Sequence, residues 1–327
     1  MLQSIINCTQ HYSLQADCDK LARFAIMPFS WGRRLMTKTC KAPDPDTRTP
    51  AFKLPPNATD AHCHIFGPGD KYPYSPTRTY TPPDAGLDDF KKLQSILGLT
   101  RAVLVNASCH GTNNDPILDA IAQSGGAYRG VANINDDFTE ADIEKLHEGG
   151  CRGCRFNFVR HLGGIPDMDK FHSIINKIKG FGWHVVLHFD AIDLVEFQDL
   201  LDDLPIPYII DHMGRVPTKD GLEQEPFKIL LEFARRDNCW IKVCGSERIS
   251  SMGPPFTDAM PFAKAIIEVA PDRVLWGTDW PHPNIKEHMP NDGDLVDLIP
   301  LMAPDEPTQQ RLLVDNPHRL YGFTNTD

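Results

Sequence analysis

Residues 60–67 read DAHCHIFG, and from this stretch onward short apolar runs alternate with amphipathic ones. His62 and His64 are separated by one cysteine, so on an extended strand their side chains point to the same side. Two imidazoles on one side of a strand suit a metal ion, but two histidines can also fill a core. The rest of the sequence has to decide between these interpretations.

Seven more apolar runs follow, each rich in Val, Ile or aromatic residues and too short for a helix. With DAHCHIF (60–66), the candidate strands are RAVLVNA (101–107), GVANI (130–134), GCRFNF (153–158), HVVLHF (184–189), YIIDH (208–212), WIKVC (240–244) and VLWGTD (274–279). The candidate helices between and after them are LDDFKKLQSIL (87–97), DPILDAIAQSG (115–125), TEADIEKLHEGG (139–150), MDKFHSIINKIKG (168–180), AIDLVEFQDLLDDL (191–204), PFKILLEFARRD (226–237), DAMPFAKAIIEVA (258–270) and PTQQRLLVDNPHRLYG (307–322).

This alternation predicts an α/β protein, a single-domain (β/α)8 barrel of the TIM type. A doubly wound open sheet is the alternative. No GxGxxG follows the first strand, where the cofactor loop of such a sheet is expected, so the barrel is favoured.

The composition excludes several classes of protein. A net charge of −11 over 327 residues, without a clustered surplus of Lys and Arg, argues against a nucleic-acid partner. No stretch approaches 18 consecutive apolar residues, so no membrane span is expected. The 9 cysteines are odd in number and scattered, which favours a reducing cytoplasm over a disulfide framework. We interpret the CxxC at Cys151 and Cys154 as structural.

The first 54 residues are predicted to be an extension and arm, and residues 55–327 the barrel domain. The extension shows no clear period and ends in the proline-rich run KAPDPDTRTPAFKLPP. Its apolar segment LARFAIMPFSW makes a poor signal peptide, because it is short and contains a proline. Met36 is a second possible start, so the membership of residues 1–35 in the mature protein is left open.

The predicted strands end on polar side chains, and reactive groups of such barrels lie at the C-terminal strand ends and in the following loops. His62, His64, His188 and Asp279 combine three imidazoles with a carboxylate, which suits one zinc ion and the activation of its water. The other polar side chains at these positions are Ser108, His110, Arg155, His212, Arg215 and Arg248.

The motifs DAHCHIFGPGDKYPYSP, ASCHGTNND, GCRFNF, GWHVV, IIDHMGR and WGTDWPHPN occur in this order. Together they resemble the lactonase branch of the amidohydrolase superfamily, over roughly residues 55–322. The resemblance implies a zinc ion on His62, His64 and His188, with Asp279 as ligand and proton acceptor. It also implies that His212 orients the attacking water or polarises the carbonyl.

The resemblance further implies that the arginines bind acidic groups of the substrate. Arg155, Arg215 and Arg248 are the candidates, because a guanidinium donates paired hydrogen bonds to carboxylate and sulfonate groups. Tyr80, Ser108 and His110 add further candidate contacts. The partner is therefore expected to be a small anionic lactone, with neither nucleic acid nor membrane involved, while the oligomeric state is not predicted.

Two residue positions distinguish the kinds of lactonase within this branch. Pyrone-dicarboxylate lactonases are metal-free and carry tyrosine where this chain has His188, and arginine where it has His161. Both departures favour metal-dependent hydrolysis of 4-sulfomuconolactone to maleylacetate and sulfite, within the degradation of aromatic compounds. The alternatives are a 2-pyrone-4,6-dicarboxylate lactonase, a related zinc decarboxylase and a non-catalytic binding barrel.

Overall fold

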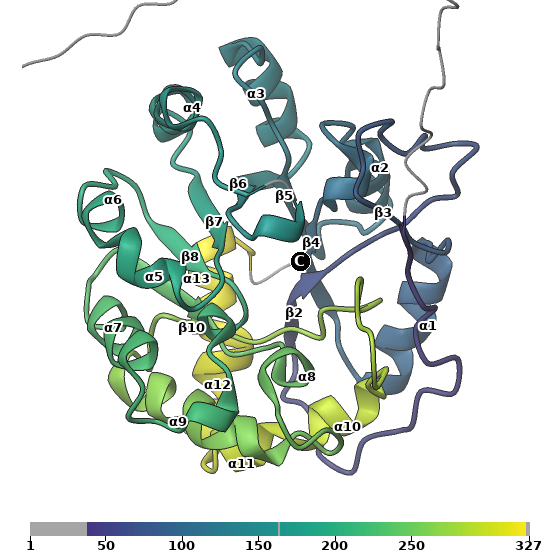
Figure 1. Ribbon diagram of the computed structural model, residues 1–327. Helices are drawn as coiled ribbons and strands as arrows, with labels where there is room; N and C mark the ends of the chain where they lie inside the picture. Colours follow the sequence, from purple (N-terminus) through teal and green to yellow (C-terminus); the bar gives the residue numbers. More distant parts are fainter. Residues whose placement is uncertain (1–37, 163, 325–327) are drawn as a thin grey trace, which may run out of the picture. The chain divides into compact units, whose positions relative to one another are not determined.

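The computed structural model describes residues 38–162 and 164–324. In these residues eight strands form one sheet, with only parallel pairs. In spatial order they are β2 (Thr59–Cys63), β4 (Arg101–Val105), β5 (Tyr128–Ala132), β6 (Cys151–Asn157), β7 (His184–His188), β8 (Tyr208–Ile210), β9 (Cys239–Lys242) and β10 (Val274–Leu275). The eight predicted strands and the α/β barrel are confirmed (Figure 1).

The helices lie around this barrel (Figure 1). They are α1 (Leu87–Leu97), α2 (Asp115–Ala122), α3 (Glu140–Glu148), α4 (Met168–Lys179), α5 (Asp193–Glu196), α6 (Gln198–Asp202), α7 (Glu225–Ala234), α8 (Ser246–Ile249), α9 (Met260–Val269), α10 (Asp292–Asp297), α11 (Ile299–Met302), α12 (Glu306–Gln310) and α13 (Asn316–Tyr321). One predicted helix is wrong as a single element, because residues 191–204 form α5 and α6 with a break at Phe197. There the Phe197 ring packs against Phe158 and Phe189.

Helix α4 shows why these segments are helical. The Asp167 carboxylate accepts hydrogen bonds from the backbone amides of Asp169 and Lys170, which caps the first turn. The helix buries Phe171, Ile174, Ile175 and Ile178. This spacing forms one apolar stripe on a helix, and the stripe faces the sheet.

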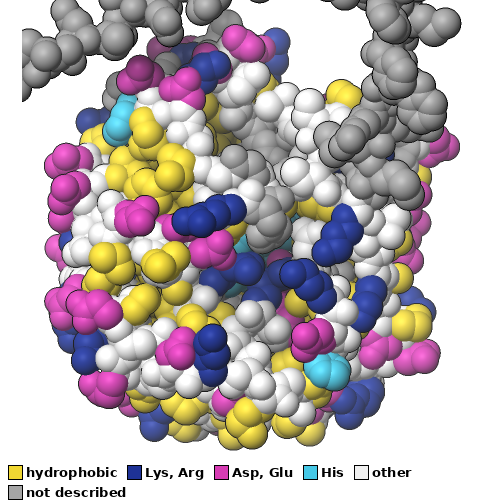
Figure 2. Space-filling model, viewed as in Figure 1, with side chains coloured by type: hydrophobic (Ala, Val, Ile, Leu, Met, Phe, Trp, Pro, Cys, Tyr) yellow, Lys and Arg dark blue, Asp and Glu magenta, His cyan; other side chains and the backbone are white. Residues whose placement is uncertain are grey.

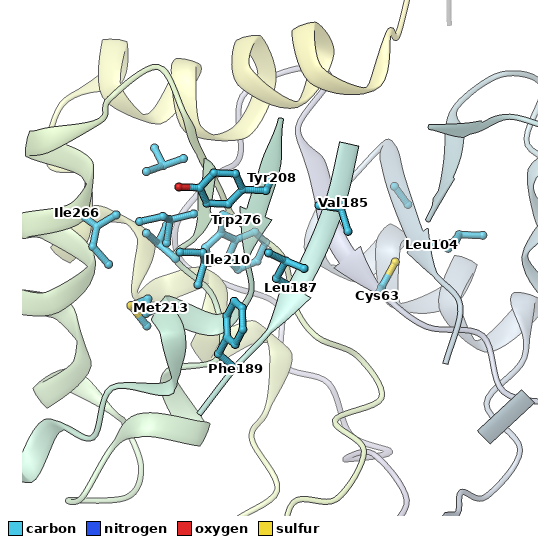
Figure 3. Packing of buried hydrophobic residues seen from close by; sticks show 14 of the residues in the cluster. Cys63, Leu104, Val185, Leu187, Phe189, Tyr208, Ile210, Met213, Ile266 and Trp276 are labelled. Carbon is cyan, nitrogen blue, oxygen red and sulfur yellow. The ribbon is translucent and has the colours of Figure 1, made fainter. Parts of the chain in front are cut away.

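The apolar core has two layers, one between the sheet and the helices and one inside the barrel. On β7, Val185 and Leu187 belong to the outer layer and Val186 to the inner one. This alternation is expected of a strand. Figure 3 shows Leu187, Ile210 of β8 and Ile266 of α9 in the outer layer. Polar side chains that share the inward face of β7, such as His188, are therefore directed into the barrel.

The barrel closes through irregular backbone, because β10 is only two residues long. Ala61 donates to the carbonyl of Trp276, His64 to that of Trp280, and Asp279 to that of His62, each at 2.8 Å. A register shift in the pairing of β2 with β4 falls between Asp60 and Cys63. Such bulges redirect side chains next to active sites.

The buried Asp60 carboxylate also stabilises this closure between β2 and the segment after β10. Its Oδ1 accepts from the amides of His62, at 3.1 Å, and Thr278, at 3.0 Å, and its Oδ2 accepts from the Thr278 hydroxyl at 2.6 Å. Burial raises the pKa of Asp60 to about 7, against the effect of these hydrogen bonds. One side chain therefore joins β2 to the segment that follows β10.

Opposite the strand ends, Tyr321 and Phe323 belong to the apolar layer inside the barrel. The guanidinium groups of Arg101 and Arg129 lie over the Phe323 ring, 5.3 and 4.7 Å from its centroid. They also donate to the backbone carbonyls of Thr324 and Gly322. This end of the barrel is thus filled by residues that follow all eight strands.

Residues 1–35 and Met36 lie outside the described residues. The described residues belong to one compact unit, in which β1 (Lys38–Thr39) pairs with β3 (Tyr80–Thr81). The division at residue 54 stays a prediction. Cys151 and Cys154 are buried in β6 as free thiols, as expected of a structural pair. Among the described helices, none combines the length and apolar character needed to cross a membrane.

We predict that Asp60→Ala lowers the free energy of unfolding by about 3 kcal/mol or more, because it leaves three buried donors without an acceptor. Asp60→Asn keeps one oxygen and is expected to lose about 1 kcal/mol. Urea denaturation followed by circular dichroism measures both. Equal losses in the two variants would contradict a role of this carboxylate as acceptor.

Candidate functional site

The polar side chains expected at the strand ends meet at one end of the barrel. His62 lies in β2 and His64 just after it, while His212 opens a 3-10 turn after β8. Asp279 follows β10 in a left-handed backbone conformation, with φ 64°, and His212 has φ 50°. Such strained backbone in non-glycine residues is concentrated at functional sites. Figure 2 shows Lys and Arg side chains gathered around the hollowed middle of the molecule's face.

Three imidazoles face one oxygen of Asp279. Its Oδ1 lies 3.6 Å from His62 Nε2, 3.4 Å from His64 Nε2 and 4.0 Å from His212 Nε2. The side chains of all four residues are almost fully buried. Burial, together with the nearby Lys242 ammonium, lowers the pKa of His62 to about 3, so its imidazole is neutral. Burial also moves the pKa of His212 well below its usual range.

His62, His64 and Asp279 fit a divalent cation. Their ligand atoms lie within 4.8 Å of one another, and His62 Nε2 is buried without a hydrogen-bond partner. Ligands at zinc-bonding distance from a common centre stand about 3.4 Å apart, which matches the two distances to Asp279 Oδ1. The donor set can therefore hold one such ion.

His188, the fourth residue of the sequence-predicted set, does not join this group. Its Nδ1 lies 3.1 Å from both Arg155 Nη2 and Asn157 Oδ1, and its ring packs against His212 at 5.3 Å. The register of the sheet places His188 directly opposite Asn157 of β6, which accounts for this contact. Its Nε2 is buried without a hydrogen-bond partner. As a zinc ligand, His188 stays a prediction.

The second oxygen of Asp279 is bound to Arg248. This arginine, on α8, donates from Nε to Oδ2 and places Nη2 against the same atom. Burial alone would raise the pKa of Asp279, but Arg248 and the neighbouring histidines hold it well below its usual range. The carboxylate is thus ionised, with one oxygen engaged by Arg248 and the other directed at the three imidazoles.

Behind the histidines lies a second buried carboxylate, Asp211. Its Oδ2 accepts from Arg155 Nε at 2.9 Å, and its Oδ1 lies 3.1 Å from Lys242 Nζ and 3.3 Å from His62 Nδ1. Lys242 is fully buried, and its Nζ lies 2.9 Å from His62 Nδ1. The site predicted from the sequence did not include Lys242 or Asp211. The available signal was a lone lysine within the apolar run WIKVC.

The remaining candidates surround this centre at different depths. Arg215 and Arg248 line a cavity of about 520 Å³, together with Lys38 and Lys286. Arg215 also donates from Nε to Asp190 Oδ1 at 2.9 Å. Arg155 is nearly buried, with its guanidinium between Asp211 and His188.

Three predicted substrate contacts lie on β3 and the turn after β4, namely Tyr80, Ser108 and His110. Burial raises the pKa of the Tyr80 phenol, and its hydrogen bond with Ser108 opposes that rise. The ring of His110 packs against those of Phe66 and Tyr74, with centroids 6.4 and 4.8 Å away.

Comparisons with known proteins agree with this geometry. A 2-pyrone-4,6-dicarboxylate hydrolase of Comamonas testosteroni is 48% identical over 281 residues, which are 83% of this chain and 92% of that protein. A 4-sulfomuconolactone hydrolase of Hydrogenophaga intermedia is 40% identical over 286 residues, 86% of this chain and 94% of that protein.

A crystal structure from Pseudomonas putida, described as a proposed 2-pyrone-4,6-dicarboxylic acid hydrolase, is 31% identical and superposes with a TM-score of 0.72. The match covers 83% of this chain and 99% of that one. The amidohydrolase family model matches residues 59–323, the whole barrel with its strand-end histidines and Asp279. The chain therefore belongs to the amidohydrolase family.

Proposed function

We propose that this chain hydrolyses a small anionic lactone of the kind met in the degradation of aromatic compounds, with Asp279 as the base. The proposal rests on the different contacts of the two oxygens of the Asp279 carboxylate. Arg248 engages Oδ2 and keeps the group ionised, while Oδ1 faces His62, His64 and His212. An ionised and oriented carboxylate can accept a proton from a water molecule held beside it.

Asp279 and His212 have distinct roles in the proposed reaction. Asp279 Oδ1 accepts a proton from water as its oxygen bonds to the lactone carbonyl carbon. His212 orients the water or polarises the carbonyl oxygen. The ring C–O bond breaks when the tetrahedral intermediate collapses, and Asp279 returns the proton to the departing oxygen, so the carboxylate is regenerated.

A zinc ion is the cofactor we propose, held by His62, His64 and Asp279, with His188 as the further candidate. When bound, it would lower the pKa of its water to about 7. The lowered pKa of His62 and the ionised carboxylate of Asp279 support this donor set.

For the substrate we propose 4-sulfomuconolactone first. Ring opening would be followed by cleavage of the C–S bond and departure of sulfite, which gives maleylacetate. Support comes from the 40% identical relative. The resemblance to the lactonase branch adds support, because it implies tyrosine in metal-free pyrone enzymes at the position of His188. Arg155, Arg215 and Arg248 would bind the carboxylate and sulfonate, with Tyr80, Ser108 and His110 as neutral contacts. A 2-pyrone-4,6-dicarboxylate is the second candidate, favoured by the 48% identical relative.

Asp279→Asn should lower kcat by about 10²–10⁴-fold, because the amide cannot accept the proton from water. Steady-state hydrolysis of the preferred lactone, followed by ring-opening absorbance, measures this. Asp193→Asn is a matched control, since Asp193 is a buried carboxylate outside the cluster. Near-normal turnover in Asp279→Asn would refute the proposed base.

Turnover of 4-sulfomuconolactone, muconolactone and 2-pyrone-4,6-dicarboxylate by enzyme of measured zinc content tests the substrate. We expect kcat/KM for the sulfonated lactone to exceed that for muconolactone by about 10- to 100-fold, which is the effect of losing one set of charge-assisted hydrogen bonds. A preference for the pyrone would establish the second candidate instead. Hydrolysis of none of the three would reject the proposed substrate class.

Removal of metal tests the cofactor. Treatment with a chelator followed by gel filtration should reduce lactone hydrolysis, and stoichiometric Zn²⁺ should restore it. Metal content is measured in parallel by mass spectrometry. Full activity in preparations that contain no metal would refute the zinc requirement, while leaving the role of Asp279 open to its own test.

A further inference from the structure

The buried Lys242 has no role in the reaction as described so far. It ends β9, is 0% exposed, and reaches across the barrel to His62, 180 residues away in the sequence. A lysine is rarely buried to this extent without a partner. Its two contacts here are His62 Nδ1 at 2.9 Å and Asp211 Oδ1 at 3.1 Å.

The contact between Lys242 and His62 fixes the position of a proton. A lysine ammonium has three N–H donors and no lone pair. A ring nitrogen 2.9 Å from it must therefore accept, so Nδ1 of His62 presents its lone pair. The single proton of the neutral imidazole then resides on Nε2, the nitrogen that faces Asp279 Oδ1.

His64 makes the opposite contact through its Nδ1. This nitrogen lies 2.7 Å from the backbone carbonyl of Val105, which can only accept, so Nδ1 carries a proton. The Nε2 of His64 lies 3.4 Å from the same Asp279 oxygen. The two histidines of the pair are thus held by different partners, Lys242 at Nδ1 of His62 and the Val105 carbonyl at Nδ1 of His64.

A metal ion on His62 requires the opposite arrangement. A histidine that binds a metal through Nε2 normally donates its Nδ1 proton to a carboxylate or carbonyl. Asp211 Oδ1 is placed for this contact at 3.3 Å from His62 Nδ1. Lys242 competes for the same nitrogen, so binding of a metal has to break the Lys242–His62 hydrogen bond and move the proton.

We propose that Lys242 is a positioning residue that fixes His62 in the Nε2–H tautomer and thereby weakens metal binding at His62, His64 and Asp279. This inference rests on the proposed metal site, but not on the identity of the lactone. The contact of Lys242 makes the metal exchangeable. When the ion leaves, the buried, charge-assisted hydrogen bond between Lys242 and His62 forms again and compensates for part of the loss. Without Lys242, His62 would donate to Asp211 and keep its Nε2 lone pair available.

The first test is the tautomer itself. Long-range ¹H–¹⁵N correlation spectra of the metal-free protein distinguish a protonated Nε2 from a protonated Nδ1, and the His62 signals are assigned by their absence in His62→Gln. We expect Nε2–H for His62 and Nδ1–H for His64. A protonated Nδ1 on His62 in the wild-type protein would overturn the proposal, and this measurement does not depend on enzymatic activity.

The second test is the affinity for Zn²⁺, from competition with a fluorescent chelator. Lys242→Met should bind Zn²⁺ about 10- to 100-fold more tightly than the wild type, the range typical of changes behind a metal ligand. Lys177→Met is the matched control, because Lys177 donates only to the backbone carbonyls of Asp136 and Phe138. Equal or weaker zinc binding by Lys242→Met would overturn the proposal, whereas a failure to hydrolyse lactones would affect only the proposed function.

Discussion

The backbone hydrogen bonds between β2 and the segment after β10 are the constraint on which the site depends. Because β10 has two residues, the last pairing of the barrel cannot be a regular ladder. The amide of Asp279 instead donates to the carbonyl of His62, and that of His64 to the carbonyl of Trp280. The same bonds that complete the barrel bring the Asp279 carboxylate to the two histidines, so closure of the fold and assembly of the site are one event.

A second constraint is the compensation of buried charge. Asp279 is paired with Arg248, and Asp211 with both Arg155 and Lys242, all at or near full burial. A buried carboxylate without such partners would take up a proton. The cations therefore keep both carboxylates ionised, which leaves the neutral imidazoles between them free to accept or donate hydrogen bonds.

Much of this arrangement could be predicted from the sequence, because it depends on local pattern. The eight strands are short Val- and Ile-rich runs, and the polar residues that end them share one edge of a parallel sheet. The break at Phe197 could not be foreseen, since it accompanies ring contacts to Phe158 and Phe189 from other segments. The contact of His188 with Asn157 depends equally on the sheet register, which pairs the two residues. Lys242 was missed because a single lysine in a strand is usually at the surface, and its burial depends on partners distant in the sequence.

The filling of the far end of the barrel by Tyr321 and Phe323 has a consequence for biosynthesis. The inner apolar layer joins residues from Ala61 of the first barrel strand to Phe323. On the ribosome, a nascent chain that still lacks residues 321–323 has the strands of the barrel but leaves part of their inward face exposed. Non-local contacts of this kind are slow to form, and partly exposed parallel strands are prone to aggregate. The interior of this barrel can therefore be completed only after residues 321–323 have been synthesised and have left the ribosome.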